Sequence, residues 1–370
     1  MYKKIFLLNG LAIIGVVVSH ATGWIQTVLL VENWYDRVRE FFPLGYNPQS
    51  SFLYFYSISV RQLVVFSVAA FLFVSGFFTS YAMGGKKRVD WKFIGHRLIY
   101  LVIPYLIWSV LIFISEYFQD IRFSAPDYLR FLLTVGADGP YYYVPLICYT
   151  YLLAPFLVLL AVKNSKGLII AAASLQFFII GLRYLQLMNV NLPHLDQVVN
   201  FFPNWSPLRW ILYFPLGLVS GLHLKQFTTW LSRHSKAFLA ITIVMIPTMV
   251  LEYELVYRTT GVRWGNVPHT FSTIIYSLAF IFLFLSLKIP KFVFPKWLYL
   301  ICLNTYGIYL LHMKLMEFVS RLSYHYFPQI LVKQWVFQPF LLVLGIGVPL
   351  LFMSAIAKSS FQRYYRFLFG

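Results

Sequence analysis

The chain has 370 residues, of which 60% are hydrophobic and only 11% are charged. A soluble domain carries about 25% charged residues, so this composition excludes an ordinary soluble protein. A net charge of +18 would suggest a nucleic-acid partner in a soluble protein, but here the charges lie mainly in short loops. The positive-inside rule of membrane proteins explains charges in such loops, so no nucleic acid is expected as a partner.

Apolar runs of about 20 residues, the length that crosses a bilayer, recur along the chain. They predict an all-α, polytopic membrane helix bundle of about ten transmembrane helices, in one domain over residues 1–370 without a separate soluble domain. The first run is too long for a signal peptide, so we interpret it as a retained span. The ten spans are predicted near residues 5–30, 60–82, 93–116, 141–162, 167–187, 207–224, 237–257, 270–287, 297–319 and 335–357.

Lysine and arginine are concentrated in one set of loops and at both ends of the chain, for example at Lys3, Lys4 and the Lys86–Lys92 cluster. By the positive-inside rule, both termini of this multi-pass protein are predicted to be cytoplasmic. The long loop 31–59 then lies outside. Several acidic residues collect in the loops of that outer side, namely Glu32, Asp36, Glu40, Asp120, Asp127, Asp138 and Asp196.

Two histidines lie within predicted spans, His20 in the first and His312 in the late segment TYGIYLLHMKL. Ionisable groups within a membrane are costly and usually face a protein interior or a water-filled cavity. Each histidine is 15 residues from the start of its predicted span, which places both roughly 22 Å into a core of about 30 Å. An imidazole can take a proton from a hydroxyl and return it to a leaving group. The alternative is a neutral histidine that only packs against another helix.

Four basic side chains fall toward the outer ends of predicted spans. They are candidates, together with Tyr309, for binding an anionic acceptor such as a lipid-linked phosphate or an acidic sugar. Snorkelling of each side chain to the interface is the alternative. Arg97, beside His96, enters its span from the cytoplasmic side and lies deeper than the loop lysines. The four outer residues are Arg61, Arg183, Arg209 and Lys314.

Other chemistry finds little support in the sequence. Ser75 and Gly76 lie mid-span, where small residues let helices approach closely, and packing is favoured over a serine nucleophile. Cys148 and Cys302 both fall in apolar spans and are interpreted as buried residues, not as a disulfide. The sequence contains no nucleotide-binding glycine loop, HExxH or CxxC motif, so neither a metal nor a tightly bound cofactor is expected.

Five segments in order along the chain resemble motifs of the membrane-bound acyltransferase-3 family, whose members acylate hydroxyls of cell-envelope and exported glycans. The arginine-then-proline motif of that family matches Arg97 and Pro104, and the histidine of its opening motif matches His20. The segments are NGLAIIGVVVSH, FLFVSGFF, RLIYLVIPYLIW, YYYVPLICYTYLLAP and TYGIYLLH.

This resemblance implies an acyl-CoA co-substrate on the cytoplasmic side and an acceptor hydroxyl on the outer side. It also implies that His20 transfers the proton, with His312 nearby, and that Arg97 helps to hold the phosphates of the donor. Asn9, itself a candidate donor-binding residue, stands where the family usually has arginine. Either donor binding relies on Lys3, Lys4 and Arg97 instead of that arginine, or the chain belongs to a divergent branch of the family.

The resemblance predicts an O-acyltransferase, with acetyl as the first expectation for the acyl group and succinyl as the alternative. Its partners are expected to be the lipid bilayer, acyl-CoA and a carbohydrate or glycolipid acceptor. The plasma (inner) membrane is the location that the resemblance implies. A non-enzymatic glycan or glycolipid transporter is the competing hypothesis, and acylation of lipid or peptidoglycan would differ only in the acceptor. Release of free CoA in the presence of acceptor would distinguish an enzyme from a transporter.

Overall fold

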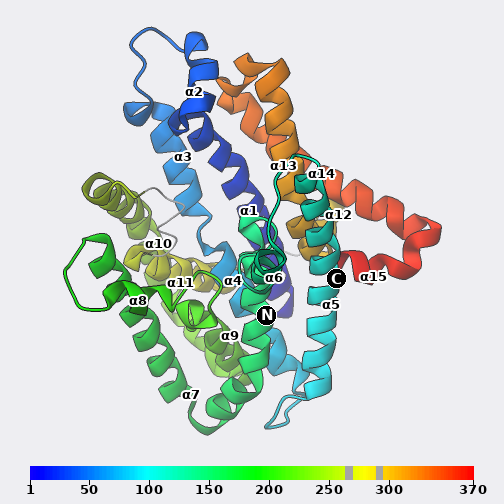
Figure 1. Ribbon diagram of the computed structural model, residues 1–370. Coiled ribbons are helices and arrows are strands. Elements are labelled where there is room, and N and C mark those ends of the chain that lie inside the picture. Colours follow the sequence, from blue (N-terminus) through cyan, green and yellow to red (C-terminus); the bar gives the residue numbers. More distant parts are fainter. Residues whose placement is uncertain (263–269, 289–294) are drawn as a thin grey trace. The chain divides into compact units, whose positions relative to one another are not determined.

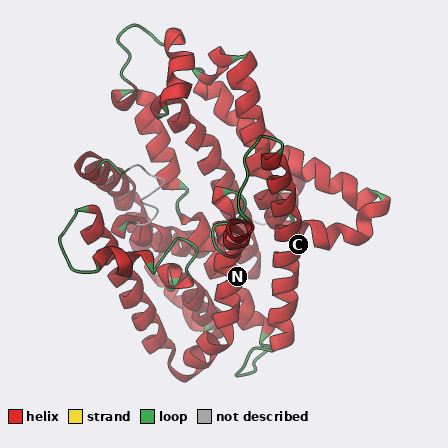
Figure 2. Ribbon diagram, viewed as in Figure 1, coloured by secondary structure: helices red, strands yellow, loops and turns green. Residues whose placement is uncertain are grey.

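A computed structural model describes the chain except residues 263–269 and 289–294. Every regular element among the described residues is a helix (Figure 2), which confirms the all-α prediction. The α-helices are α1 (Tyr2–Leu30), α2 (Glu32–Val38), α3 (Phe52–Leu63), α4 (Phe66–Ala82), α5 (Trp91–Tyr117), α6 (Ala125–Leu133), α7 (Tyr143–Leu187), α8 (Leu195–Asn200), α9 (Tyr213–Leu222), α10 (Leu224–Thr260), α11 (Phe271–Ser286), α12 (Lys296–Leu303), α13 (Thr305–Tyr326), α14 (Gln334–Lys358) and α15 (Tyr365–Phe369).

The chain forms two compact units that alternate along the sequence. Unit 1 comprises Met1–Ile5, Val68–Lys288 and Arg366–Gly370, and unit 2 comprises Phe6–Ser67 and Ile289–Tyr365. Each unit therefore combines segments from distant parts of the chain. That the whole chain is a single domain stays a prediction.

Six stretches of the described chain are long and apolar enough to cross a membrane. Two shorter apolar helices, α9 and α11, accompany them. A polytopic helical membrane protein is thereby confirmed, whereas the number ten stays a prediction. The six stretches are Tyr2–Leu30, Phe52–Ala82, Trp91–Tyr117, Gly139–Leu187, Leu224–Thr260 and Gln334–Lys358.

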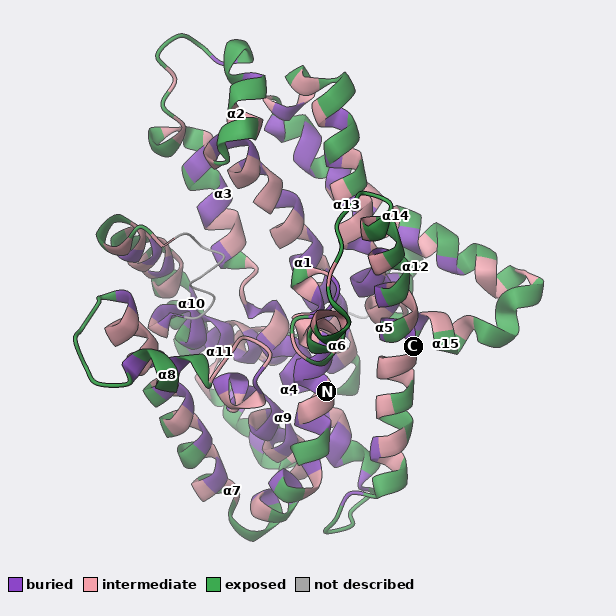
Figure 3. Cartoon of the chain, in the orientation of Figure 1, coloured by how far each residue is buried: buried purple, intermediate pink, exposed green. Residues whose placement is uncertain are grey.

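The outer surfaces of several helices carry the apolar side chains that contact with lipid requires. On α5, for example, Ile99, Val110 and Ile114 are each nearly half exposed. In Figure 3 exposed positions recur along α5 and α14. Water would make such surfaces costly, whereas lipid tails make them neutral.

Helix α7 contains the predicted fourth and fifth spans, which meet at Asn164. The backbone of Asn164 is not helical (φ −154°, ψ 84°), and its side-chain oxygen accepts a hydrogen bond of 2.9 Å from the Gly167 N–H. Figure 1 shows the two halves of α7 meeting at a sharp turn. The predicted break between residues 162 and 167 therefore lies at the right place.

Several predicted boundaries are wrong. The seventh predicted span begins at residue 237, whereas α10 already begins at Leu224. The second membrane stretch begins at Phe52 and not at residue 60, because the hydroxyl of Ser51 caps α3 by accepting from the Tyr54 N–H. The predicted ninth span, 297–319, is broken between α12 and α13 at Asn304. The side-chain amide of Asn304 donates to the Leu300 carbonyl, and its oxygen accepts from the Tyr365 hydroxyl at 2.6 Å. Such local side-chain bonds compete with helix continuation.

Helices α4 and α9 of unit 1 cross at very short distance. A Cβ atom added at Gly76 would lie 2.0 Å from the Phe214 carbonyl oxygen, and one added at Gly217 would lie 1.9 Å from that of Phe73. Only glycine permits such an approach at these positions, so the packing role predicted for Gly76 is confirmed.

Candidate active site

The two intramembrane histidines lie together in unit 2. The ring centroids of His20 on α1 and His312 on α13 are 5.3 Å apart, with an angle of 51° between the ring planes. His312 is fully buried and His20 is half-buried. The structure thus brings these two distant residues side by side, while their depth in the membrane and their catalytic role stay predictions.

The helix itself fixes the state of His312. Its Nδ1 lies 3.0 Å from the Ile308 carbonyl oxygen and 2.8 Å from that of Tyr309. Since a carbonyl can only accept, Nδ1 carries the proton, and the neutral ring then has its lone pair on Nε2. Among the described residues this Nε2 is buried and has no hydrogen-bond partner. A buried acceptor without a partner costs about 1–3 kcal/mol, so this atom calls for a functional explanation.

Polar side chains continue from the histidine pair along the α1–α3–α14 packing of unit 2. The Arg61 guanidinium lies within electrostatic range of His20 and donates a hydrogen bond of 2.6 Å to Gln26. The side-chain oxygen of Gln338 on α14 accepts a hydrogen bond of 2.8 Å from the Tyr56 hydroxyl. The side-chain amide nitrogen of Gln338 donates to the Thr22 hydroxyl. Arg61 is thus one of the predicted acceptor residues that lie near the pair.

Three aromatic rings cluster near the pair in unit 2. Trp24, one helical turn after His20, has its ring centroid 5.4 Å from Trp34 of α2, and Trp34 lies 4.5 Å from Tyr324 of α13. All three side chains are partly exposed. This cluster was not predicted from the sequence, although the spacing of four residues between His20 and Trp24 places both on one face of α1.

The other predicted acceptor residues of unit 2 have structural partners. Tyr309 is buried, with its ring 6.1 Å from that of His312. Lys314 forms an ion pair of 2.8 Å with Glu317, which also pairs with Arg321 at 2.8 Å. These contacts place Tyr309 against the pair and Lys314 on an ion-pair network.

The predicted donor residues lie in both units. Asn9 of unit 2 donates from its amide to the Thr305 hydroxyl at 3.0 Å, which joins α1 to the start of α13. Lys4 of unit 1 donates to the Leu285 carbonyl at 2.7 Å, near the C-terminus of α11, where a cation is favoured. Each of these two side chains therefore uses one N–H group in a hydrogen bond that holds two helices together.

Arg97 lies on an exposed basic surface of unit 1. Its guanidinium sits over the Phe93 ring, 5.3 Å from the centroid, and the side chain is exposed. The ring of Tyr2 lies 5.0 Å from that of Tyr81, which brings the start of α1 against the end of α4. Four more exposed cations follow α4 and open α5, namely Lys86, Lys87, Arg88 and Lys92.

The remaining acceptor candidates, Arg183 and Arg209, lie in unit 1. Arg209, in the short 3-10 helix Pro207–Trp210, is 7% exposed and donates to the Phe202 carbonyl at 3.4 Å. It lies outside the six membrane-length stretches. Burial, together with the nearby charge of Arg183, lowers the pKa of the Arg209 guanidinium to about 10, so it remains charged at neutral pH. The structure thus divides the five predicted acceptor residues between the two units.

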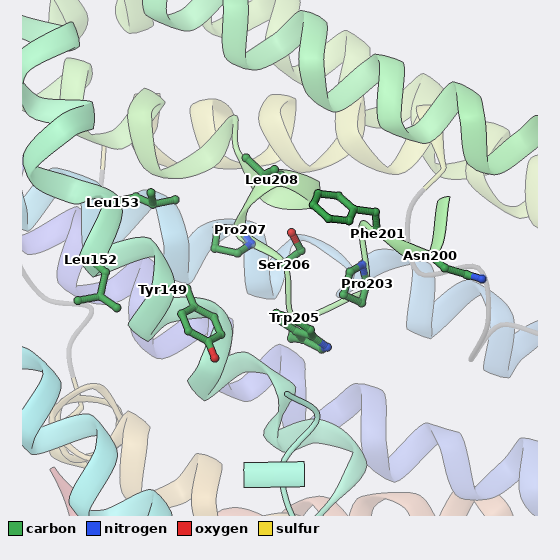
Figure 4. A pocket seen from close by; sticks show the side chains of 10 residues that line it. All are labelled: Tyr149, Leu152, Leu153, Asn200, Phe201, Pro203, Trp205, Ser206, Pro207 and Leu208. Carbon is green, nitrogen blue, oxygen red and sulfur yellow. The ribbon is translucent and has the colours of Figure 1, made fainter. Parts of the chain in front are cut away.

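A pocket of about 590 Å³ lies in unit 1 beside the segment that carries Arg209. In Figure 4, Tyr149, Leu152 and Leu153 of α7 line one side, and residues from Asn200 to Leu208 line the other. The rings of Tyr149 and Trp205 lie 5.8 Å apart. Most of the lining is apolar, as in sites that hold the body of a small amphiphile.

Cys148 and Cys302 are free thiols, as the sequence predicts. Within the described ranges, no group of three or more His, Cys, Asp or Glu residues is arranged to hold a metal ion.

Comparison with known proteins identifies the family. No curated protein and no solved structure matches the chain significantly. The model of a family described as an acyltransferase domain, however, matches residues 3–354, which include both histidines and nearly the whole chain. The chain therefore belongs to the acyltransferase-3 family of membrane acyltransferases.

Proposed function

We propose that this membrane acyltransferase moves an acetyl group from cytoplasmic acetyl-CoA to a hydroxyl of an envelope or exported polysaccharide or glycolipid, in the plasma (inner) membrane. The observation that carries the proposal is the histidine pair. One of its imidazoles holds a buried lone pair that no described protein group satisfies. An acceptor hydroxyl bound beside the pair can give its proton to His20, while this lone pair can accept a hydrogen bond from the His20 ring.

The chemistry needs one proton to move through the pair. The acceptor hydroxyl gives its proton to an imidazole while its oxygen attacks the thioester carbonyl carbon. A C–O bond forms, the C–S bond breaks, and the proton passes to the departing thiolate, so that the products are an ester and free CoA. His20, the half-buried ring, takes the acceptor's proton on one nitrogen. The Nε2 lone pair of His312 is then available to accept a hydrogen bond from the other, protonated nitrogen of His20, which orients and stabilises the imidazolium.

The exposed basic surface around Arg97 supports a phosphate-bearing donor at the cytoplasmic end. Five cations gather there, and arginine binds phosphate through paired N–H groups. Lys4 adds a further charge within the same unit. In this proposal Asn9 contributes to the donor side through the packing of α1 on α13, in place of the arginine of other family members.

The aromatic cluster supports a carbohydrate as the acceptor. Flat, partly exposed rings of Trp and Tyr combine an apolar face with a polar edge, which suits the apolar face and hydroxyl rim of a sugar. One helical turn, about 5.4 Å, separates Trp24 from His20, which is close to the length of one pyranose ring. A sugar stacked on Trp24 would bring a hydroxyl to the histidines.

The function is tested by measuring labelled acetyl transfer from acetyl-CoA to envelope glycan in membranes that contain the protein. Acceptor-dependent release of free CoA thiol, with label recovered as a base-labile ester, is the expected result. Succinyl-CoA is tested in parallel, because faster transfer from it would replace acetyl by succinyl. Glycan movement across the membrane without any thiol release would instead establish a transporter.

Substitution of Trp24 separates acceptor binding from chemistry. We expect Trp24→Ala to raise the KM for acceptor about tenfold, because stacking on an aromatic ring contributes on the order of 1 kcal/mol or more. The KM for acetyl-CoA is expected to stay unchanged. Trp230→Ala, an exposed tryptophan on α10 of unit 1, is the matched control. An equal rise in the KM values for acceptor and for acetyl-CoA would indicate that Trp24 only maintains packing.

A further inference from the structure

The Arg209 guanidinium is a buried cation without a counter-charge. It is more than nine-tenths buried, and its one hydrogen bond with a described residue goes to the Phe202 carbonyl. No described carboxylate lies within ion-pair distance of it, and residues 263–269 and 289–294 contain no Asp or Glu. Burying a charge without a partner costs several kcal/mol. Arg209 therefore has donors and charge to offer to an anion.

A second guanidinium acts at the same place. Arg183, near the end of α7, lies within electrostatic range of Arg209 and raises the local positive charge. Arg183 donates to Gln186, whose amide in turn donates to Asp196 at 2.7 Å. Tyr184, the next residue, fixes the end of α7 by donating from its hydroxyl to Glu252 at 2.6 Å. Arg183, at the end of α7, therefore adds its positive charge to that of Arg209 in the 3-10 helix Pro207–Trp210.

The segment that carries Arg209 is also held in place. The Trp210 indole donates to the Asn204 carbonyl at 2.9 Å, and the Arg209 N–H donates to the Ser206 carbonyl at 3.2 Å. The Leu212 N–H donates to the buried Gln176 at 3.0 Å, which ties the segment to α7. The guanidinium is therefore positioned before any ligand arrives, as an anion-binding site requires.

We propose that Arg209 and Arg183 bind the phosphate group of a membrane lipid, whose apolar part occupies the adjacent pocket of unit 1. Guanidinium groups bind phosphate oxygens through paired hydrogen bonds, and two arginines suit an anion of charge above one. The Phe202 carbonyl that accepts from Arg209 lies between Phe201 and Pro203, which both line the pocket. Leu152, Leu153 and Phe201 supply the apolar surface.

The site makes a prediction about binding that does not depend on acyl transfer. Purified protein in detergent is titrated with polyprenyl phosphate and with phosphatidic acid, and the unfolding temperature is recorded. Polyprenol and diacylglycerol, which keep the tails and lack the phosphate, are the matched ligands. We expect only the phosphate-bearing lipids to raise the unfolding temperature. Equal shifts from the neutral lipids would overturn the proposal.

Two variants identify the site. With Arg209→Met, we expect the same rise in unfolding temperature to require an about tenfold or higher concentration of phosphate-bearing lipid, because a charge-assisted hydrogen bond is lost. Without lipid this variant should be at least as stable as the wild type, because a buried cation without a counter-charge is removed. Arg130→Met, which removes an exposed arginine of unit 1 paired with Asp127, should change neither result. A variant that is destabilised without lipid but keeps the full shift would contradict the proposal.

Arg183→Gln gives an independent reading, because this side chain is only half-buried and its loss should leave folding intact. We expect Arg183→Gln to raise the lipid concentration needed for the shift in unfolding temperature as much as Arg209→Met does. The two lipids also distinguish the source of the phosphate. Saturation by polyprenyl phosphate at lower concentration indicates a lipid-linked glycan, whereas equal saturation by phosphatidic acid indicates a bilayer phospholipid. Failure of acyl transfer with intact lipid binding would reject the proposed function alone.

Discussion

His312→Leu should abolish acyl transfer while leaving the protein as stable as the wild type, or more stable. The leucine keeps most of the side-chain volume and removes a buried Nε2 that has no partner among the described residues. Replacing such an atom by an apolar group is neutral or stabilising. The rate should nevertheless fall by up to about 10²–10⁴-fold, the usual contribution of general acid–base catalysis, because His20 loses the partner that orients it for proton transfer. Most histidine substitutions in a packed core would show the opposite pattern for stability.

His20→Ala is expected to lower the rate over the same range. The dissociation constant for acetyl-CoA should remain unchanged in both variants, because neither ring holds the donor in the proposed arrangement. His223→Ala, which removes an exposed histidine at the end of α9, is the matched control and should keep the wild-type rate. Rates of labelled transfer and unfolding temperatures are measured on the same preparations. A wild-type rate in His20→Ala would reject its proton-transfer role.

A common level for His20 and His312 could be predicted from the sequence because the thickness of the bilayer relates position along a span to depth. Because a helix rises about 1.5 Å per residue through a hydrocarbon core of about 30 Å, the residue count from the start of each span gives the depth of each ring, and the two depths are the same. The two rings lie side by side in the structure although the predicted ninth span is broken at Asn304, since α13 continues beyond the break. Depth carries no information on which helices are neighbours, however. Arg61, Arg183 and Arg209 were predicted at one level and are divided between two units.

The finer features of the site depend on contacts that no local pattern encodes. The proton on Nδ1 of His312 follows from carbonyls of its own helix, but the lack of a partner at Nε2 depends on all the surrounding helices. Trp34 and Tyr324 reach Trp24 from segments that are unrelated in sequence position. By contrast, Ser75–Gly76 was predicted as a packing site, because small residues within spans have few other roles.

Gly217→Ala should be among the most destabilising single changes in unit 1. The new methyl group would lie 1.9 Å from the backbone oxygen of Phe73, and a backbone atom cannot turn aside as a side chain can. The helices α4 and α9 must separate, which we expect to cost about 3 kcal/mol or more, the upper range for overpacking. Gly181→Ala on α7 is the matched control, since no atom lies within 4 Å of its added methyl. That change should be neutral or stabilising, because alanine favours the helix.

The double variant Gly76→Ala with Gly217→Ala tests whether one crossing explains both effects. Each added methyl meets the backbone of the opposite helix, at Phe214 for Gly76 and at Phe73 for Gly217. Once the first methyl has separated α4 from α9, the second finds part of its space already open. The loss in unfolding temperature should therefore be smaller than the sum of the two single losses, as for residues that share one contact. Strictly additive losses would mean that the two glycines relieve separate clashes and that the helices do not move as a pair.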